Sequence, residues 1–158
     1  AVPKIEKVII NTGFGKQIVV KTSQEQEKFR DAIVNDLSLI TGQKPILSLS
    51  KKSISAFKLR KNLAIGAVAS LRGKRMYDFL ERLIYIALPR SRDFRGIDQK
   101  SVDRNGNLTI GIKEQIIFSE VSPENVKGIF GLEITVVTTA KTHDKGLGLL
   151  KLMGFPIK

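Results

Sequence analysis

The sequence contains no cysteine and only one histidine, His143. Without cysteine the chain can form no disulfide, no thiolate metal site and no cysteine nucleophile, and this absence fits a reducing compartment. One histidine also leaves a transition-metal site without most of its usual nitrogen and sulfur ligands. The functions that remain are those that need only backbone, hydroxyl, amide and charged groups.

Long apolar runs are absent as well. No stretch approaches the roughly 18 uninterrupted apolar residues that a membrane span requires, and no short apolar block follows a basic N-terminus as in a secretory signal. We therefore expect a soluble protein without a membrane partner. The 158 residues, 42% of them hydrophobic and 27% charged, predict one compact domain over residues 1–158.

Acidic residues are in the minority, with 15 Asp and Glu against 27 Lys and Arg, for a net charge of +12. A sequence pI near 10.1 at this size is typical of a protein with a polyanionic partner, and nucleic acid is the first candidate. Residues 44–104 hold 15 basic and 5 acidic side chains, which leaves a net charge of only +2 for the other 97 residues. The alternative is a basic surface that serves solubility alone.

Catalytic patterns are weak. Residues 13–16 (Gly-Phe-Gly-Lys) follow a predicted strand, but they lack the third glycine of a dinucleotide fingerprint and the Gly-Lys-Ser/Thr of a P-loop, so we predict a tight turn. Asp144 adjoins His143, and we expect the two side chains to point in different directions on the surface. Glu114, Glu120, Glu124 and Glu133 show no metal-binding pattern. We expect no enzyme, no metal and no cofactor.

Apolar periodicity predicts a strand over residues 4–11 and a helix over residues 23–40, with a capping box at Ser23 and Gln26 and a stop at Gly42. Further strands and helices are predicted along the chain. Asn105-Gly106 predicts a hairpin directly before the strand over residues 108–112. The strands are 43–50, 64–71, 108–112 and 132–139; the helices are 76–87, closed by Pro89, a short one after Ser122-Pro123, and 147–153.

This element order favours an α+β fold, a mainly antiparallel sheet with helices packed on one face and the other face open for RNA. Three groups of cations could hold phosphates. They are a weakly anchored basic stretch around Phe57, a strand-to-helix junction, and a loop over residues 90–96. For the first group, a solvated loop with Phe57 folded into the core is the alternative. The cations are Lys51, Lys52, Lys58, Arg60 and Lys61; Arg72, Lys74 and Arg75; and Arg90, Arg92 and Arg95.

Several strings closely resemble family five of the large-subunit ribosomal proteins, in its bacterial or organellar form, and the resemblance runs from Val2 to the C-terminus. The strings are Gly42-Gln43-Lys44-Pro45, Ser70-Leu71-Arg72-Gly73, Leu88-Pro89-Arg90-Ser91-Arg92-Asp93-Phe94-Arg95-Gly96, Glu114-Gln115-Ile116-Ile117-Phe118 and Thr138-Thr139-Ala140-Lys141.

The resemblance implies a structural protein that holds 5S ribosomal RNA in the central protuberance, with 23S-type rRNA and other large-subunit proteins as neighbours. Ser70 stands where family members usually have threonine, so a hydroxyl remains. Neutral groups would meet 2′-hydroxyls and base edges while cations take phosphates. The 5S rRNA contacts implied by matching position are Asn11, Thr12, Gln43, Lys44, Ser70 and Arg72.

The resemblance further implies that residues 53–62, through Ser53, Phe57, Lys58, Arg60 and Lys61, reach the elbow of the peptidyl-site tRNA. Residues 104–118 would approach a small-subunit head protein in an intersubunit bridge. The family's N-terminal helical segment before Val2-Pro3 is expected to be trimmed from this sequence. The implied location is the large ribosomal subunit, in the bacterial cytoplasm or an organelle. A free RNA chaperone or general RNA-binding module is the alternative function.

Overall fold

The computed structural model describes residues 2–51, 63–92, 94–122, 124 and 128–158. Its strands form one five-stranded antiparallel sheet in the order β2-β3-β1-β5-β4, so the first strand of the chain lies at the centre. The strands are β1 (Ile5–Gly13), β2 (Ile46–Leu49), β3 (Ala64–Leu71), β4 (Leu108–Ile112) and β5 (Leu132–Thr138).

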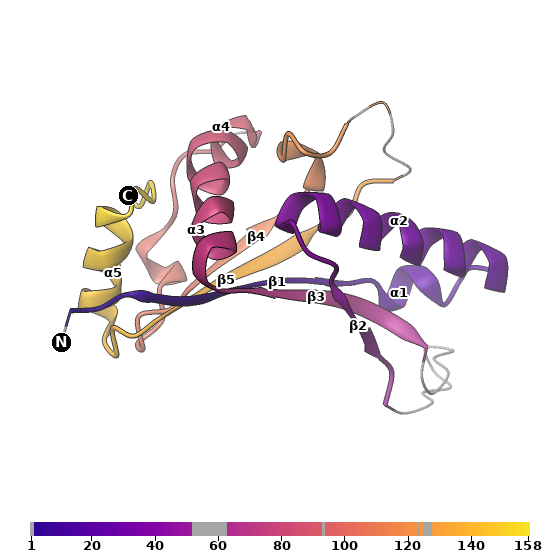
Figure 1. Ribbon diagram of the computed structural model, residues 1–158, viewed down its shortest axis with the longest axis horizontal. Helices are drawn as coiled ribbons and strands as arrows, with labels where there is room; N and C mark the ends of the chain where they lie inside the picture. The colour runs from indigo at the N-terminus through magenta and orange to yellow at the C-terminus, as the bar shows by residue number, and fades with distance from the viewer. Residues whose placement is uncertain (1, 52–62, 93, 123, 125–127) are drawn as a thin grey trace.

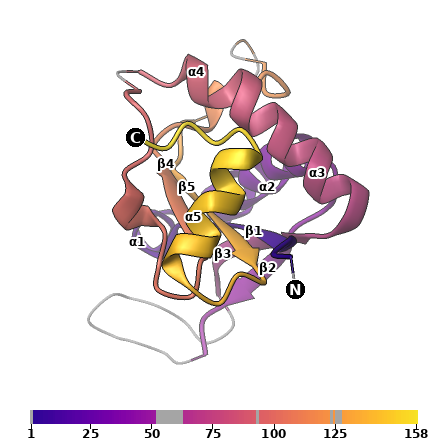
Figure 2. The ribbon, with the colours of Figure 1, turned by 90° about the vertical axis from the view of Figure 1, so that its left-hand side faces the viewer.

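Helices cover only one face of this sheet. Figure 1 shows α2 and α3 above the sheet, with the face below it bare among the described residues, and Figures 1 and 2 show α5 across one end of the strands. The predicted α+β class is confirmed. The helices are α1 (Gly15–Ile18), α2 (Ser23–Thr41), α3 (Gly73–Arg82), η2 (Leu83–Ala87), α4 (Leu88–Arg90), η3 (Gln99–Ser101), η4 (Gln115–Ile117) and α5 (His143–Leu152).

The central strand β1 alternates between the two faces. Val8 and Ile10 are fully buried under the helices, whereas Ile9 and Asn11 lie on the opposite face. The predicted strand over residues 4–11 is thus confirmed, although it extends through Gly13. The expected tight turn at residues 13–16 is wrong, because Phe14 is buried and leads directly into the short helix α1.

Helix α2 matches the predicted helix, but its cap lies one residue earlier than expected. The Thr22 hydroxyl accepts the backbone N–H of Glu25 at 3.3 Å, so the capping pair is Thr22 and Glu25 instead of Ser23 and Gln26. At the other end Gly42 has φ 80°, the left-handed conformation in which glycine ends helices without strain. The stop at Gly42 is confirmed.

The helix predicted over residues 76–87 begins three residues earlier, at Gly73, and the helical run ends at Arg90, one residue after the predicted stop at Pro89. The wider π-helical turn η2 follows α3, and Pro89 lies in the short helix α4 that continues directly from it. The chain therefore runs as one helical rod from Gly73 to Arg90, about 25 Å long at about 1.5 Å per residue. The short helix predicted after Ser122 falls largely on residues 123 and 125–127, outside the described part of the chain.

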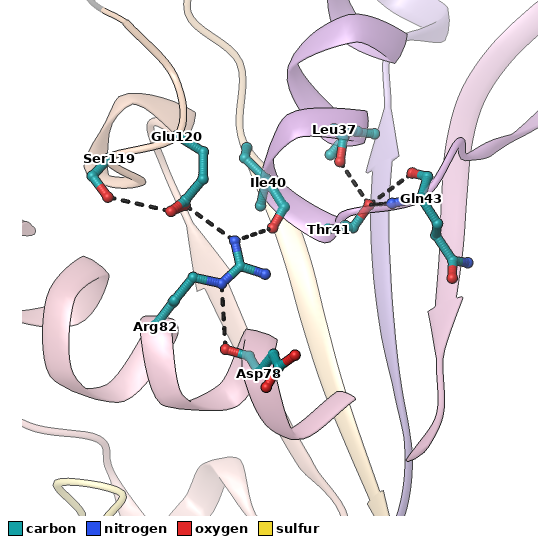
Figure 3. Close-up of polar contacts among 8 residues, drawn as sticks. All are labelled: Leu37, Ile40, Thr41, Gln43, Asp78, Arg82, Ser119 and Glu120. Atoms are coloured by element: carbon teal, nitrogen blue, oxygen red, sulfur yellow. Dashed lines mark hydrogen bonds and ion pairs between the residues drawn. The ribbon is translucent and has the colours of Figure 1, made fainter. Parts of the chain in front are cut away.

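Arg82 fastens α3 to the end of α2. One guanidinium nitrogen donates to the backbone carbonyl of Ile40 at 2.9 Å and lies 3.4 Å from a carboxylate oxygen of Glu120, while Nε donates to the carbonyl of Asp78 at 3.3 Å (Figure 3). A cation on a carbonyl in the last turn of α2 complements the negative end of the helix dipole. This contact fixes the C-terminal end of α2 against α3. No helix in the described ranges is long and apolar enough to span a membrane.

The bridge Val102↔Leu108 confirms the predicted hairpin. Two glycines, Gly106 and Gly146, allow α5 to pack closely against it. Gly106 has φ 85°, and a Cβ placed on Gly146 would collide with the Cα of Gly106 and lie 2.6 Å from its carbonyl oxygen. Backbone atoms cannot yield as a flexible side chain can. The two segments can pack this closely only because both positions lack a side chain.

We predict that Gly146→Ala lowers the free energy of unfolding by about 2 kcal/mol, because the added methyl group must push the hairpin away from α5. Urea denaturation followed by circular dichroism measures the change. Gly148→Ala is the matched control: a Cβ there meets nothing within 4 Å, so alanine should stabilise the helix by about 0.5–1 kcal/mol. Equal effects of the two substitutions would contradict the close contact.

Candidate RNA interface

Strand pairing determines which side chains share the uncovered face of the sheet. Ile9 of β1 pairs with Ser70 of β3 on one side and with Thr135 of β5 on the other. Asn11, two residues further along β1, pairs with Val68 and Glu133. Because residues two apart in a strand point to the same face, Asn11 and Ser70 are diagonal neighbours on this open face.

The polar groups of this face are available to a partner. Asn11 and Ser70 are both exposed, and in the described part of the chain neither the Asn11 amide nor the Ser70 hydroxyl has a hydrogen-bond partner. Their neighbours Ile9, Val68 and Thr135 are half-buried and apolar or β-branched. The centre of the open face therefore offers hydrogen-bonding groups on a weakly hydrophobic floor, with the exposed carboxylate of Glu133 opposite Asn11.

Gln43 lies at the edge of this face and is held at both ends of its side chain. Its amide nitrogen donates to the Ser70 carbonyl at 3.0 Å, and Arg75 donates to its amide oxygen at 3.2 Å. Its backbone is fixed by the buried Thr41, whose hydroxyl oxygen lies 2.9 Å from the Gln43 carbonyl and accepts the Gln43 N–H at 3.3 Å (Figure 3). The loop after α2 is thereby joined to the end of β3 and the start of α3.

The start of α3 concentrates positive charge beside Gln43. Arg72 occupies the N-cap position, no side chain caps the helix, and its first turn contains no acidic residue. Lys44, Arg72, Lys74 and Arg75 are exposed around it. Uncapped N–H groups at the positive end of a helix, together with cations, favour a bound anion such as a phosphate. The structure thus brings Gln43, Lys44, Ser70 and Arg72 together, as the resemblance implied.

Thr12 does not join this group through its side chain. It is 3% exposed on the helix-covered face, and its hydroxyl donates to the Gly131 carbonyl at 2.6 Å. The alternation of β1 turns Thr12 away from Asn11, because adjacent residues of a strand face opposite sides. Its side chain holds the segment before β5, and we leave it out of the candidate interface.

Other members of the open face were not identified from the sequence. Thr135 and Thr109 pair across β5 and β4, and Ile46, 73% exposed, pairs with Val68 at the opposite edge. The alternation of each strand separates its two faces, but only the strand order shows that these residues share one surface. A contact set drawn from short strings could not include them.

The remaining cations fall into two places. Arg90 ends the helical rod, about 25 Å from the start of α3, and Arg92 and Arg95 are exposed in the segment that follows it. Lys51 is exposed just after β2. Six further predicted contacts lie outside the described residues; they are Lys52, Ser53, Phe57, Lys58, Arg60 and Lys61.

No cluster of potential metal ligands occurs within the described ranges. His143 is half-buried, and its Nε2 lies 3.1 Å from the Gln99 carbonyl. The expectation that His143 and Asp144 point apart is wrong: Nδ1 lies 3.5 Å from an Asp144 carboxylate oxygen. Asp144 stands in the exposed first turn of α5, and the contact joins two residues at the start of that helix.

Comparison with known proteins identifies the family to which this chain is similar. The model of the ribosomal protein L5 family matches residues 1–60, and a second model, which describes the C-terminus of the same ribosomal family, matches residues 64–157. The two matched stretches share one sheet, because β1 from the first lies between β3 and β5 from the second.

Curated bacterial relatives match nearly the whole chain. Large ribosomal subunit protein uL5 of Syntrophomonas wolfei is 51% identical over 157 residues, which cover 99% of this chain and 85% of the relative. The uL5 protein of Desulforamulus reducens is 53% identical over 155 residues, covering 98% and 82% of the two chains. That of Halothermothrix orenii is 48% identical, covering 99% and 84%. The chain belongs to the uL5 family, and it is accordingly a structural, non-enzymatic protein of the large ribosomal subunit in the bacterial cytoplasm.

Proposed function

We propose that this chain binds 5S ribosomal RNA through the open face of its sheet and the adjoining start of α3. The observation that carries the proposal is the adjacency of two kinds of group. Exposed neutral groups, Asn11 and Ser70, lie on an uncovered sheet face, and exposed cations border it at an uncapped helix start. Membership of the uL5 family supports RNA as the partner.

The arrangement suits a folded RNA with both duplex and unpaired parts. Phosphates would meet Lys44, Arg72 and Lys74, which carry charge without reading sequence. Hydroxyl and amide groups at Ser70, Asn11 and Gln43 would meet 2′-hydroxyls and base edges. The shape of the face would select the RNA, and the neutral groups would add the preference for 5S rRNA over other RNAs.

Further contacts belong to the same proposal. Residues 53–62, with Ser53, Phe57, Lys58, Arg60 and Lys61, lie outside the described part of the chain, and we propose on the family resemblance that they contact the peptidyl-site tRNA elbow. Arg104 and Asn105 are exposed at the tip of the 102–108 hairpin, where a small-subunit head protein could meet them in an intersubunit bridge. Neighbouring large-subunit proteins and 23S-type rRNA complete the proposed partners.

Competition binding tests the proposal. A 5S-specific protein retains labelled 5S rRNA when excess tRNA or duplex RNA is added, because those competitors do not satisfy the neutral groups of the open face. Filter binding or fluorescence anisotropy at fixed salt measures the retained fraction. Comparable affinity for all three RNAs would favour a free RNA chaperone or general RNA-binding module instead.

We expect Ser70→Ala to weaken 5S rRNA binding about five-fold, as the loss of one hydrogen bond should, while the slope of log affinity against log salt stays unchanged. The slope is unaffected because no counterion is released by a neutral contact. Ser23→Ala removes an exposed serine hydroxyl at the distant start of α2 and should change neither quantity. Gln43→Ala should also weaken binding, although it additionally removes the contacts to Ser70 and Arg75. An unchanged affinity for Ser70→Ala would contradict the open face as the recognition surface.

Arg72→Ala should behave differently. The loss of one phosphate contact is expected to lower the steepness of the salt dependence by roughly 0.7–1, together with the affinity at low salt. Titrations of 5S rRNA at several salt concentrations measure both. Lys28→Ala removes an exposed cation from α2 on the helix-covered side and serves as the control for net charge. Equal slopes for the two variants would mean that the start of α3 is not at a phosphate.

A further inference from the structure

A second site lies at the far end of the helical rod. There the chain encloses an open hollow of about 550 Å³ between η2 and α4, the loop before Ile97, and the C-terminal tail. Its volume is in the range of pockets that hold small organic groups. The side chains that matter for its chemistry are Tyr85, Pro89, Phe94, Arg95, Pro156 and Lys158.

The walls of the hollow are fixed by backbone contacts. Ile97 donates its N–H to the Pro156 carbonyl at 2.8 Å, and Lys158 donates to the Ile97 carbonyl at 3.0 Å, so the tail is tied to the loop as a short parallel bridge. Gly96 has φ 101°, and a Cβ there would lie 3.1 Å from the Pro156 carbonyl oxygen. The C-terminal tail is therefore a built part of the site.

Tyr85 is the exposed aromatic side chain of this hollow. It stands in the π-helical turn, a local irregularity that is common at functional sites, and it is 65% exposed. A Cβ on Gly154, which has φ 101°, would lie 2.6 Å from the Tyr85 hydroxyl oxygen and 3.4 Å from the ring carbon that carries it. The hydroxyl end of Tyr85 thus rests on the backbone at Gly154, which holds the ring in position while leaving most of it exposed.

The lining combines flat apolar surfaces with positive charge. Tyr85, Phe94 and two prolines supply the apolar surface, and Arg95 and Lys158 supply cations, whereas no acidic side chain is among the described lining residues. Arg90 and Arg92 are exposed on the same segment of the chain. Aromatic and apolar surfaces with adjacent cations suit a flat aromatic ring that carries negative charge nearby. An unpaired nucleotide has this combination in its base and phosphate.

We propose that this hollow binds one unpaired RNA nucleotide, with its base against Tyr85 and its phosphate at Arg95 and Lys158. The proposal rests on the proposed RNA-binding function but concerns a different surface, because the hollow lies on the helix side of the sheet and the 5S-binding face lies opposite. The positive rim favours RNA over a neutral or basic protein segment. The chain would then hold two RNA segments at once, on opposite sides.

The test uses the full chain and two labelled six-unit oligonucleotides at low salt, one of uridines and one with the same backbone but no bases. Fluorescence anisotropy measures both affinities. Because stacking of a base on an aromatic ring strengthens binding by about five-fold or more, the uridine oligonucleotide should bind at least that much tighter. Tyr85→Ala should abolish this base preference, and Tyr85→Phe should retain it.

Tyr77→Ala is the matched control, since Tyr77 is the other tyrosine of the chain, lies on α3, is 46% exposed and does not line the hollow. It should leave the base preference intact. Arg95→Ala should weaken binding of both oligonucleotides alike. Equal binding of the two oligonucleotides by the unsubstituted chain, or a base preference that survives Tyr85→Ala, would overturn the proposal.

Affinity for 5S rRNA separates this inference from the proposed function. Tyr85→Ala should leave 5S binding unchanged, whereas Ser70→Ala should weaken it and leave the base preference of the oligonucleotides intact. If Ser70→Ala weakens 5S binding but the unsubstituted chain binds the two oligonucleotides equally, the proposed function stands and the nucleotide site is refuted. A loss of 5S affinity in Tyr85→Ala would contradict the statement that the two surfaces bind RNA independently.

Discussion

The register of β1 between its two neighbours is the constraint on which the rest of the structure depends. Val8 and Ile10 are fully buried, and they pair with the core-facing Leu71 and Ala69 of β3 and with Val136 and Ile134 of β5. A slip of one residue would expose two large apolar side chains, at about 1.5–3 kcal/mol each, and would turn Asn11 into the core. Such a cost is a large share of the roughly 5–15 kcal/mol that typically stabilises a domain. The burial of Val8 and Ile10 in the core thereby determines which residues of β1 lie on the open face.

The neutral side chains of the open face are held more rigidly than the cations at the start of α3. Asn11 and Ser70 are positioned by strand pairing, which tolerates little displacement, while Arg72 and Lys74 extend from a helix start on long exposed side chains. Phosphate binding needs charge more than exact geometry, whereas a hydrogen bond weakens steeply when its angle or distance changes. Rigid strands therefore carry the neutral groups, and the less constrained helix start carries the charges.

Periodicity in the sequence was sufficient to predict the main elements, such as the strand over residues 64–71, but not their irregularities. The helical run ends at Arg90, one residue past the predicted stop at Pro89, because the fixed φ of proline is itself compatible with a helix. The family resemblance named Gln43, Ser70 and Arg72, which the structure brings together, and it also named Thr12, whose side chain is buried on the other face. A string match does not distinguish a side chain from its neighbour in the strand. Tyr85 was not singled out from the sequence, since neither its place in a π-helical turn nor its approach to Gly154 can be seen there.

Internal contacts hold the Gln43 side chain in place without occupying all of its hydrogen-bonding groups. A side-chain amide has two N–H donors and two acceptor lone pairs on its oxygen. In this structure one donor meets the Ser70 carbonyl and one lone pair accepts Arg75, which leaves one donor and one lone pair for the proposed RNA partner. A mobile glutamine would lose up to about 2 kcal/mol of rotamer freedom when it is fixed by a ligand. Here the fold has already fixed it, so under the proposed function a 2′-hydroxyl that met Gln43 would gain its hydrogen bonds without most of that cost.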